Sequence, residues 1–307
     1  MKKHPLFGVA GNPPNFWKSK FSKSRVNSPF WLKSVGLDAL EVQCGYGVRM
    51  KDEDAIALYN NSKECNIELS IHGPYYISLG SNDPEKVNRS LNELFKSCKL
   101  AKKIGAKKIV FHLGSIYGNR DLARKNAIKT LKIFESEWFE DFNDILLLPE
   151  VAGKINQFGS LEDIIEICKN LKHTLPCIDF AHLHARNHGS LKKKSDFENV
   201  LKILLDTFYD KFANNFHVHL YPVEFGNGGE VTHKAFSDNI LYNEQFVLFE
   251  DTDIFDKRYY PRYEPFINTI IELNLSPTII CEAKDTQDIG ALEMKVFYKK
   301  ILEFNDV

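Results

Sequence analysis

Short runs rich in Val, Ile and Phe alternate eight times with longer segments of helical period along this chain. Such alternation is typical of a parallel sheet whose strands are joined by helices. The predicted strands occupy residues 6–10, 39–43, 68–72, 108–112, 145–150, 176–179, 216–220 and 277–282. The helical patterns occupy residues 53–65, 84–104, 121–139, 161–172, 196–213, 262–274 and 290–304. Eight strand–helix units are the number in a closed barrel, so we expect an α/β fold with a single (β/α)8 TIM barrel over residues 1–307.

The seventh unit is longer than the others. Residues 221–261 form a long insertion after the seventh strand, with the sequence GNGG at 226–229 and RYYPRY at 258–263. Long loops on this face of a barrel usually bind or cover a substrate. A doubly wound open sheet is the alternative architecture, but it would need a GxGxxG turn after the first strand. The sequence GVAGN at 8–12 does not supply one.

Composition indicates a globular protein without an overall charge preference. The chain is 43% hydrophobic and 26% charged, with a net charge of −1, so only a local basic patch could attract nucleic acid. Its six cysteines form no CxxC pair and indicate buried thiols in a reducing compartment. The first residues lack the apolar run of a signal peptide, and no apolar segment reaches about 18 residues. We therefore expect a cytoplasmic protein that does not bind membranes; the sequence indicates no protein partner.

Metal-binding residue types stand at the carboxyl ends of most predicted strands. They are His72, His112, Glu150, Asp179, His219 and Glu282, with the segment around Glu41 as a weaker seventh case. A parallel barrel gathers its strand ends at one mouth, where catalytic residues of such barrels lie. A single histidine at a strand end is more often structural, but buried strand ends seldom tolerate several unpaired acids. Imidazoles and carboxylates suit zinc, manganese or iron, so a shared cation would balance them.

Strand period distinguishes two neighbouring histidines in the seventh strand. His217 and His219 share one face, and His219 is nearer the carboxyl end, so His219 is the predicted ligand. His217 would lie one layer deeper, as a core residue or a partner of a ligand. Two more histidines could reach the mouth from loops: His182, directly after the strand that ends at Asp179, and His233 in the insertion.

These segments together resemble the endonuclease IV family of apurinic/apyrimidinic endonucleases, within the xylose-isomerase-like barrels. The matching stretches are HGPYYISL at 72–79, FHLGS at 111–115, EVAG at 150–153 followed by QFG at 157–159, CIDFAH at 177–182, HL at 219–220 and ICE at 280–282. The stretch 177–182 is the closest match. The resemblance extends from the third predicted strand to the eighth.

The resemblance implies a zinc centre of two or three ions, with manganese as an alternative metal. His72, His112 and Glu150 would hold one ion, and Glu150 would bridge to a second ion held by Asp179, His219 and Glu282. His182 and His233 would serve a third. Glu150 and Glu282 would be the catalytic carboxylates and Tyr75 a DNA contact. A metal-bridged hydroxide would then attack the phosphodiester 5′ to an abasic site in DNA.

The chain departs from the family pattern beside the third ion. Tyr221-Pro222 stands where the family has Asn-Asp after the histidine of the seventh strand. The family's Asp-x-His pair reads VTH at 231–233, so its aspartate is missing, and Glu230 or Glu224 could replace it. Two ions are therefore better supported than three, and loss of the third would weaken the case for phosphodiester cleavage.

The substrate has two interpretations. The loop after the first strand interleaves Lys18, Lys20 and Arg25 with aromatic residues, which suits contact with a DNA backbone, although an ordinary solvated loop can look the same. The alternative is a sugar phosphate isomerase or epimerase with one divalent metal, which needs Glu150, Asp179, His219 and Glu282, with Arg186 holding a phosphate. His72 and His112 distinguish these two interpretations, because an enzyme with one metal ion has less use for two additional histidine ligands. A barrel that only binds ligands is a third interpretation.

Overall fold

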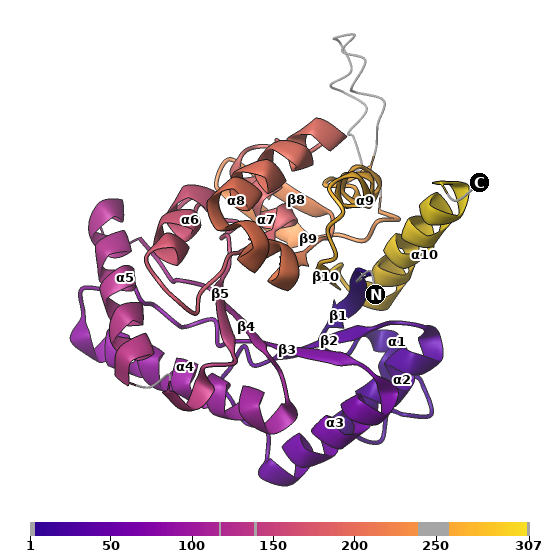
Figure 1. Cartoon of the computed structure of the whole chain (residues 1–307), viewed down its shortest axis with the longest axis horizontal. Coiled ribbons are helices and arrows are strands. Elements are labelled where there is room, and N and C mark those ends of the chain that lie inside the picture. Colours follow the sequence, from indigo (N-terminus) through magenta and orange to yellow (C-terminus); the bar gives the residue numbers. More distant parts are fainter. Residues whose placement is uncertain (1–3, 117, 138–139, 239–257, 306–307) are drawn as a thin grey trace.

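Eight parallel strands surround a common axis in the computed structural model, which describes residues 4–116, 118–137, 140–238 and 258–305 (Figure 1). They are β1 Leu6–Ala10, β2 Ala39–Gln43, β3 Glu68–His72, β4 Lys108–Phe111, β5 Leu146–Pro149, β6 Cys177–Asp179, β7 His217–His219 and β10 Thr278–Cys281. Their order is β5-β4-β3-β2-β1-β10-β7-β6, and parallel bridges Leu147–Thr174 and Glu150–Cys177 join the two ends. The predicted α/β TIM barrel is confirmed.

Helices cover the outside of the barrel (Figure 1). They are α1 Pro14–Trp17, α2 Ser28–Val35, α3 Asp52–Cys65, α4 Pro84–Ile104, α5 Arg120–Glu137, α6 Leu161–Lys169, α7 Phe180–Arg186, α8 Lys194–Asn215, α9 Tyr263–Glu272 and α10 Gln287–Asn305. Local sequence sets several ends. The Asp83 side chain caps α4, a Ser160–Asp163 capping box begins α6, and Gly105 with φ 73° ends α4. None of the described helices is long and apolar enough to cross a bilayer.

The predicted loop after β6 and the insertion after β7 contain regular structure. His182 was expected in a loop, but it lies in α7, whose first turn is capped by the Asp179 carboxylate accepting from the His182 N–H at 2.7 Å. Within 221–261 the chain forms an antiparallel hairpin, β8 Val223–Gly226 and β9 Gly229–His233. Residues 239–257 of this insertion lie outside the described part of the chain.

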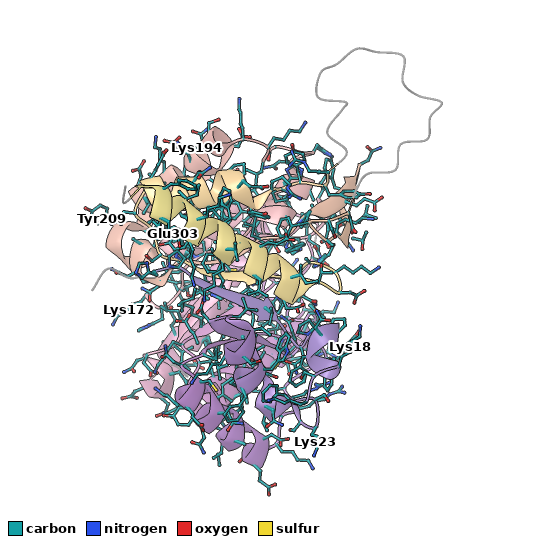
Figure 2. All side chains as sticks on the ribbon, turned by 90° about the vertical axis from the view of Figure 1, so that its right-hand side faces the viewer. Lys18, Lys23, Lys172, Lys194, Tyr209 and Glu303 are labelled. Atoms are coloured by element: carbon teal, nitrogen blue, oxygen red, sulfur yellow. The ribbon has the colours of Figure 1, made fainter. Side chains whose placement is uncertain are left out.

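Two apolar clusters fill the structure. The large one lies between the outer face of the strands and the helices and includes Ile71, Ile109 and Leu147. A small one inside the barrel consists of Val110, Leu148, Leu175 and Cys177. The six cysteine thiols are free and buried. Side chains that point to water, such as Lys18 and Lys23, extend from the outer surface (Figure 2).

The rest of the barrel interior is polar. Side chains of Glu68, Lys108 and Thr278 bond to one another near the amino ends of the strands, with 3.0 Å between Lys108 Nζ and Glu68 Oε1. Glu41, Ser70 and His217 form the next layer and are fully buried. The interior thus carries two hydrogen-bonded layers beneath the mouth.

Candidate metal centre

The first predicted cluster forms as expected from three neighbouring strands. His72 ends β3, while His112 and Glu150 directly follow β4 and β5. The His72 Nε2 atom lies 3.0 Å from Glu150 Oε2, and His112 Nε2 lies 3.4 Å from the same oxygen. One ligand atom from each residue falls within 4.8 Å of the others, which is a spacing that one metal ion can span.

The second cluster shares Glu150 with the first. His219 Nδ1 lies 3.1 Å from Glu150 Oε1, 3.7 Å from Asp179 Oδ2 and 3.8 Å from Glu282 Oε1. Glu150, Asp179 and His219 satisfy the same 4.8 Å spacing, and all three are buried. The two oxygens of Glu150 therefore face different clusters, as a bridging carboxylate requires.

A third cluster combines α7 with the hairpin. His182 Nε2 lies 3.2 Å from Glu230 Oε2, and His233 Nε2 lies 3.2 Å from Glu230 Oε1. The three residues satisfy the metal spacing. Of the two acids considered as replacements for the missing aspartate, Glu230 occupies this position. Glu224 instead pairs with Lys234 at 2.7 Å.

Tyr221 occupies the interior beside this third cluster. Its side chain is fully buried, and its hydroxyl donates to Asp179 Oδ2 at 2.9 Å. Its ring stacks on His233 with centroids 4.2 Å apart. The departure seen in the sequence after His219 is thus a structural partner that holds one ligand of the second cluster and one of the third.

Tight backbone contacts dock the hairpin on the segment after β5. The Glu230 N–H donates to the Gly153 carbonyl at 3.2 Å, and the Ile155 N–H donates to the Gly228 carbonyl at 3.1 Å. A Cβ atom on Gly229 would lie 2.3 Å from the Gly153 carbonyl oxygen, so only glycine allows this approach. The docking brings Glu230 to His182.

Arg186, predicted to hold a substrate phosphate, is bound to the backbone. Its guanidinium is buried and donates to the carbonyl oxygens of 152, 154, 155 and 157, the shortest contact being 2.7 Å to Lys154. With its donors used in this way, Arg186 fixes the segment that receives the hairpin. That it holds a substrate phosphate stays a prediction, for which these contacts leave fewer donors.

The other predicted substrate residues are exposed. Tyr75 is 56% exposed, and its ring lies beside His112 with centroids 6.4 Å apart and planes 28° from parallel. Lys18, Lys20 and Arg25 are exposed on the segment after β1, where Arg25 lies over the Trp17 ring at 5.7 Å. Their contact with a substrate stays a prediction.

The pKa shifts of the cluster residues show that their buried carboxylates are stabilised by nearby positive charge. Burial would raise the pKa of Glu150, but the His112 and His219 imidazoles lower it well below its usual range. Burial would lower the pKa of His72, but Glu150 raises it to about 9. Burial lowers the pKa of His112 to about 4 and raises that of Glu282. Protons on imidazoles thus balance buried carboxylates, and a divalent cation does the same without them.

The residues present fit a metal centre. Nitrogen and carboxylate oxygen donors converge in three adjacent groups, and the buried Nδ1 atom of His112 has no hydrogen-bond partner among the described residues. Such donor sets suit zinc or manganese. The sequence indicated Glu230 only as one of two possible acids, and Glu41 only as a weaker case at a strand end that was not assigned to a metal. Glu41 satisfies the metal spacing with His219 and Glu282. Its position on the inward face of β2, next to Gln43 by strand period, was the available signal.

Comparison with known proteins places the chain among barrels of this type. The family model described as xylose isomerase-like TIM barrel matches residues 30–300. An uncharacterized protein of Methanocaldococcus jannaschii is 28% identical over 293 residues, covering 95% of this chain and 96% of that protein.

Two further similarities are to proteins with different names. The protein named "Probable endonuclease 4" of Mycoplasma pneumoniae is 27% identical over 161 residues, which is 51% of this chain and 53% of that protein. The solved structure of a D-tagatose 3-epimerase-like protein superimposes with a TM-score of 0.67 at 14% identity, covering 98% of this chain and 100% of that one. The second similarity concerns the fold alone.

Proposed function

Because the chain belongs to the xylose isomerase-like TIM barrel family, we propose that it is a metal-dependent hydrolase that cleaves DNA phosphodiesters 5′ to abasic sites. The observation that carries this proposal is the presence of three adjacent ligand clusters, two of which share Glu150. The partial sequence similarity to an endonuclease 4 supports the same reaction. Zinc is the metal that we propose, with manganese as the alternative.

A one-metal isomerase accounts for fewer of the residues. It would need Glu150, Asp179, His219 and Glu282, and would leave two clusters of histidines without a task. Both His72 and His182 are buried beside carboxylates. Burying such polar groups is costly, and a bound metal would account for their presence. Arg186, which that alternative would use to hold a phosphate, is bound to backbone carbonyls.

The metal ions, Glu150 and Glu282 have separate roles in the proposed reaction. Divalent ions, when bound, stabilise negative charge on phosphoryl oxygens and make water a better nucleophile. Glu150 fixes the first two clusters relative to each other because its oxygens face both. Burial raises the pKa of Glu282, which makes its carboxylate a better proton acceptor than an exposed glutamate.

Exposed residues around the mouth would bind the DNA. Tyr75 offers a ring face beside His112, on which a base or sugar next to the lesion can stack. Lys18, Lys20 and Arg25 would neutralise backbone phosphates.

The test compares cleavage of an abasic duplex by the zinc-loaded protein and its variants. Wild type should cut 5′ to the abasic site, whereas His112→Ala and Glu282→Ala should lose at least about 100-fold in rate. Interconversion of a ketose phosphate by a protein that leaves the duplex intact would favour the isomerase instead.

Metal counting separates the two functions independently of any substrate. Elemental analysis should find two or more ions per chain, and Glu230→Gln should remove one of them. Glu224→Gln is the matched control, because Glu224 lies on the same hairpin but pairs with Lys234. A count of one ion in wild type would contradict the proposal.

A further inference from the structure

Beneath the proposed metal centre, Glu41 is a carboxylate with no exposure to solvent. Its Oε2 atom accepts from His217 Nε2 at 3.0 Å and from the Ser70 hydroxyl at 3.1 Å. Its Oε1 atom lies 3.1 Å from His219 Nε2. This distance is short enough for a hydrogen bond, but the angle between the two groups is not favourable for one. Glu41 therefore joins β2, β3 and β7 at the layer directly below the ligands.

The two nitrogens of His219 face different surroundings. Nδ1 faces the second cluster, with Glu150 at 3.1 Å, Asp179 at 3.7 Å and Glu282 at 3.8 Å. Nε2 faces Glu41. A neutral imidazole binds a metal through one nitrogen while the other carries the proton, and a carboxylate beside the second nitrogen fixes that arrangement.

We infer that Glu41 is the positioning residue of His219: it holds the ring with its Nε2 protonated and its Nδ1 free for a metal ion. This inference rests on the proposed metal centre and deepens it. Glu41 is not a ligand in this account, although it lies within metal-binding distance of His219 and Glu282. Its carboxylate makes the imidazole a stronger electron-pair donor to a metal ion and fixes the orientation of the ring.

His217 supports this arrangement from the deeper layer. It is fully buried and donates to the Glu41 oxygen that does not face His219, so the two histidines use opposite oxygens of one carboxylate. Ser70 adds a second donor to the same oxygen as His217. The carboxylate, carried by β2, is thus held by donors from β3 and β7, which keeps its other oxygen directed at His219.

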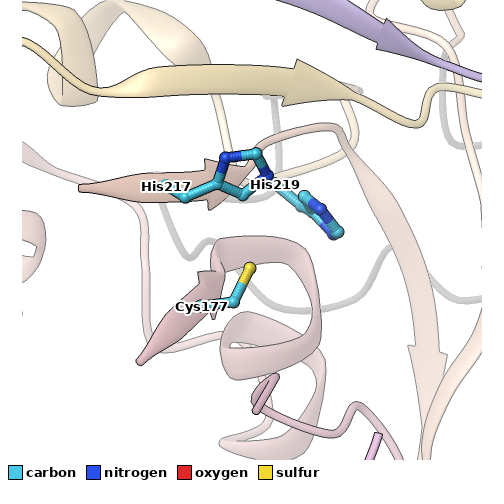
Figure 3. Close-up of side chains that lie close together, drawn as sticks. All are labelled: Cys177, His217 and His219. Atoms are coloured by element: carbon cyan, nitrogen blue, oxygen red, sulfur yellow. The ribbon is translucent and has the colours of Figure 1, made fainter. Parts of the chain in front are cut away.

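A competing use of these residues is a second, deeper metal site. Cys177, His217 and His219 satisfy the metal spacing, and Figure 3 shows the Cys177 sulfur directed toward the strand that carries both histidines. The Nδ1 atom of His217 is buried without a hydrogen-bond partner. However, His219 Nδ1 faces the second cluster, so an ion in the deeper group that used Nε2 would leave His219 with metals on both nitrogens and no proton. The nearby Glu41 carboxylate favours the N–H on that side instead.

The first experiment measures zinc affinity of the metal-stripped full chain by competition with a chromophoric chelator. Glu41→Gln keeps the shape of the side chain but removes its charge, and it should weaken binding of one ion about 10- to 100-fold. Glu68→Gln is the matched control, because Glu68 is also an interior carboxylate but bonds only to Lys108 and Thr278 among the contacts described. Its zinc affinity should stay within about twofold of wild type. Equal losses in both variants, or none in Glu41→Gln, would overturn the inference.

The second experiment needs no variant. Nitrogen NMR of histidine-labelled, zinc-loaded wild type should show His219 with a protonated Nε2 and a metal-bound Nδ1. A metal on Nε2, or anomalous scattering from an ion between Cys177, His217 and His219, would contradict it. Neither measurement uses DNA. Weakened zinc binding in Glu41→Gln together with an intact abasic duplex would therefore refute only the proposed function.

Discussion

At Gly153 a Cβ atom would lie 2.6 Å from His182 Cδ2 and 2.7 Å from Glu230 Oε2. Gly153→Ala must therefore push these two residues apart, with an overpacking cost of about 1–3 kcal/mol. We expect this variant to bind one metal ion fewer than wild type while it keeps the ions of the other two clusters. Elemental analysis after gel filtration measures the loss.

Gly228→Ala is the control for this substitution. Gly228 lies at the tip of the hairpin, and a Cβ atom there would meet no atom within 4 Å. Its metal content and free energy of unfolding should match those of wild type. An undiminished metal count in Gly153→Ala would show that the third cluster tolerates displacement and that its geometry is not decisive.

His72 makes the stability of the metal-free protein depend on pH. Glu150 raises the pKa of His72 to about 9 in the folded chain, against an ordinary value of 6.5. The stabilisation of the folded state by protonated His72 is complete below pH 6.5 and is lost as the pH rises through 9. Within this window the free energy of unfolding should fall by about 1.4 kcal/mol per pH unit from this group.

Urea denaturation of chelator-treated protein at several pH values measures this slope. The slope should decrease in His72→Gln and in zinc-loaded wild type, where no proton is needed on the ring. A metal-free protein that becomes more stable between pH 6.5 and 9 would contradict the prediction.

Residue types at strand ends predicted the first two clusters, because a parallel barrel converts scattered strand ends into neighbours. His72, Glu150 and Asp179 needed no further information. Glu230 was only one of two possible acids, since the choice depends on how the hairpin folds back on Gly153. Glu41 was noticed only as a weaker strand-end case, and its role was not predicted because its partners, His217 and His219, lie 176 and more residues away.

At the scale of elements, the segment 152–157 is the support of the third cluster. Arg186 of α7 donates to four of its carbonyl oxygens, and the hairpin docks on the same segment. Arg186→Lys cannot reproduce the planar fork and should leave carbonyls unsatisfied, at a cost of about 1–3 kcal/mol. The third ion should be released first during chelation.

Arg89→Lys is the comparison for that variant, because Arg89 is exposed on α4 and bonds one carbonyl of its own helix. Its unfolding midpoint and metal content should not change. If Arg186→Lys also keeps both, the segment is held by the hairpin alone.

Elements with a clear period were predicted well, and compact irregular ones were not. The first three strands have the predicted bounds because alternation and flanking turns define them. By contrast, every side chain of α7 is buried, so its seven residues show no polar face that would indicate a helix. The hairpin was hidden in a glycine-rich insertion, where loop and strand patterns look alike.

On the scale of the whole molecule, the proposed DNA contacts predict a salt effect. The net charge is −1, so binding must depend on local cations and not on an overall field. Each of the single substitutions Lys18→Ala, Lys20→Ala and Arg25→Ala should weaken DNA binding. Each should also reduce the magnitude of the slope of log K against log salt by about 0.9.

Fluorescence anisotropy with an abasic duplex at several salt concentrations measures this slope. Lys300→Ala on α10 serves as the control, since Lys300 is exposed on the outer helical layer. Equal slopes for Lys18→Ala and Lys300→Ala would place the DNA elsewhere.

The closed floor of the barrel has a kinetic consequence. Below the ligands lie the buried layer of Glu41 and the apolar cluster of Val110, Leu148, Leu175 and Cys177. We therefore expect a bound ion to exchange through the mouth, where the side chains of His112 and Glu282 are partly exposed. The residence time of zinc would then depend on the ligands at the mouth and not on the layers below them.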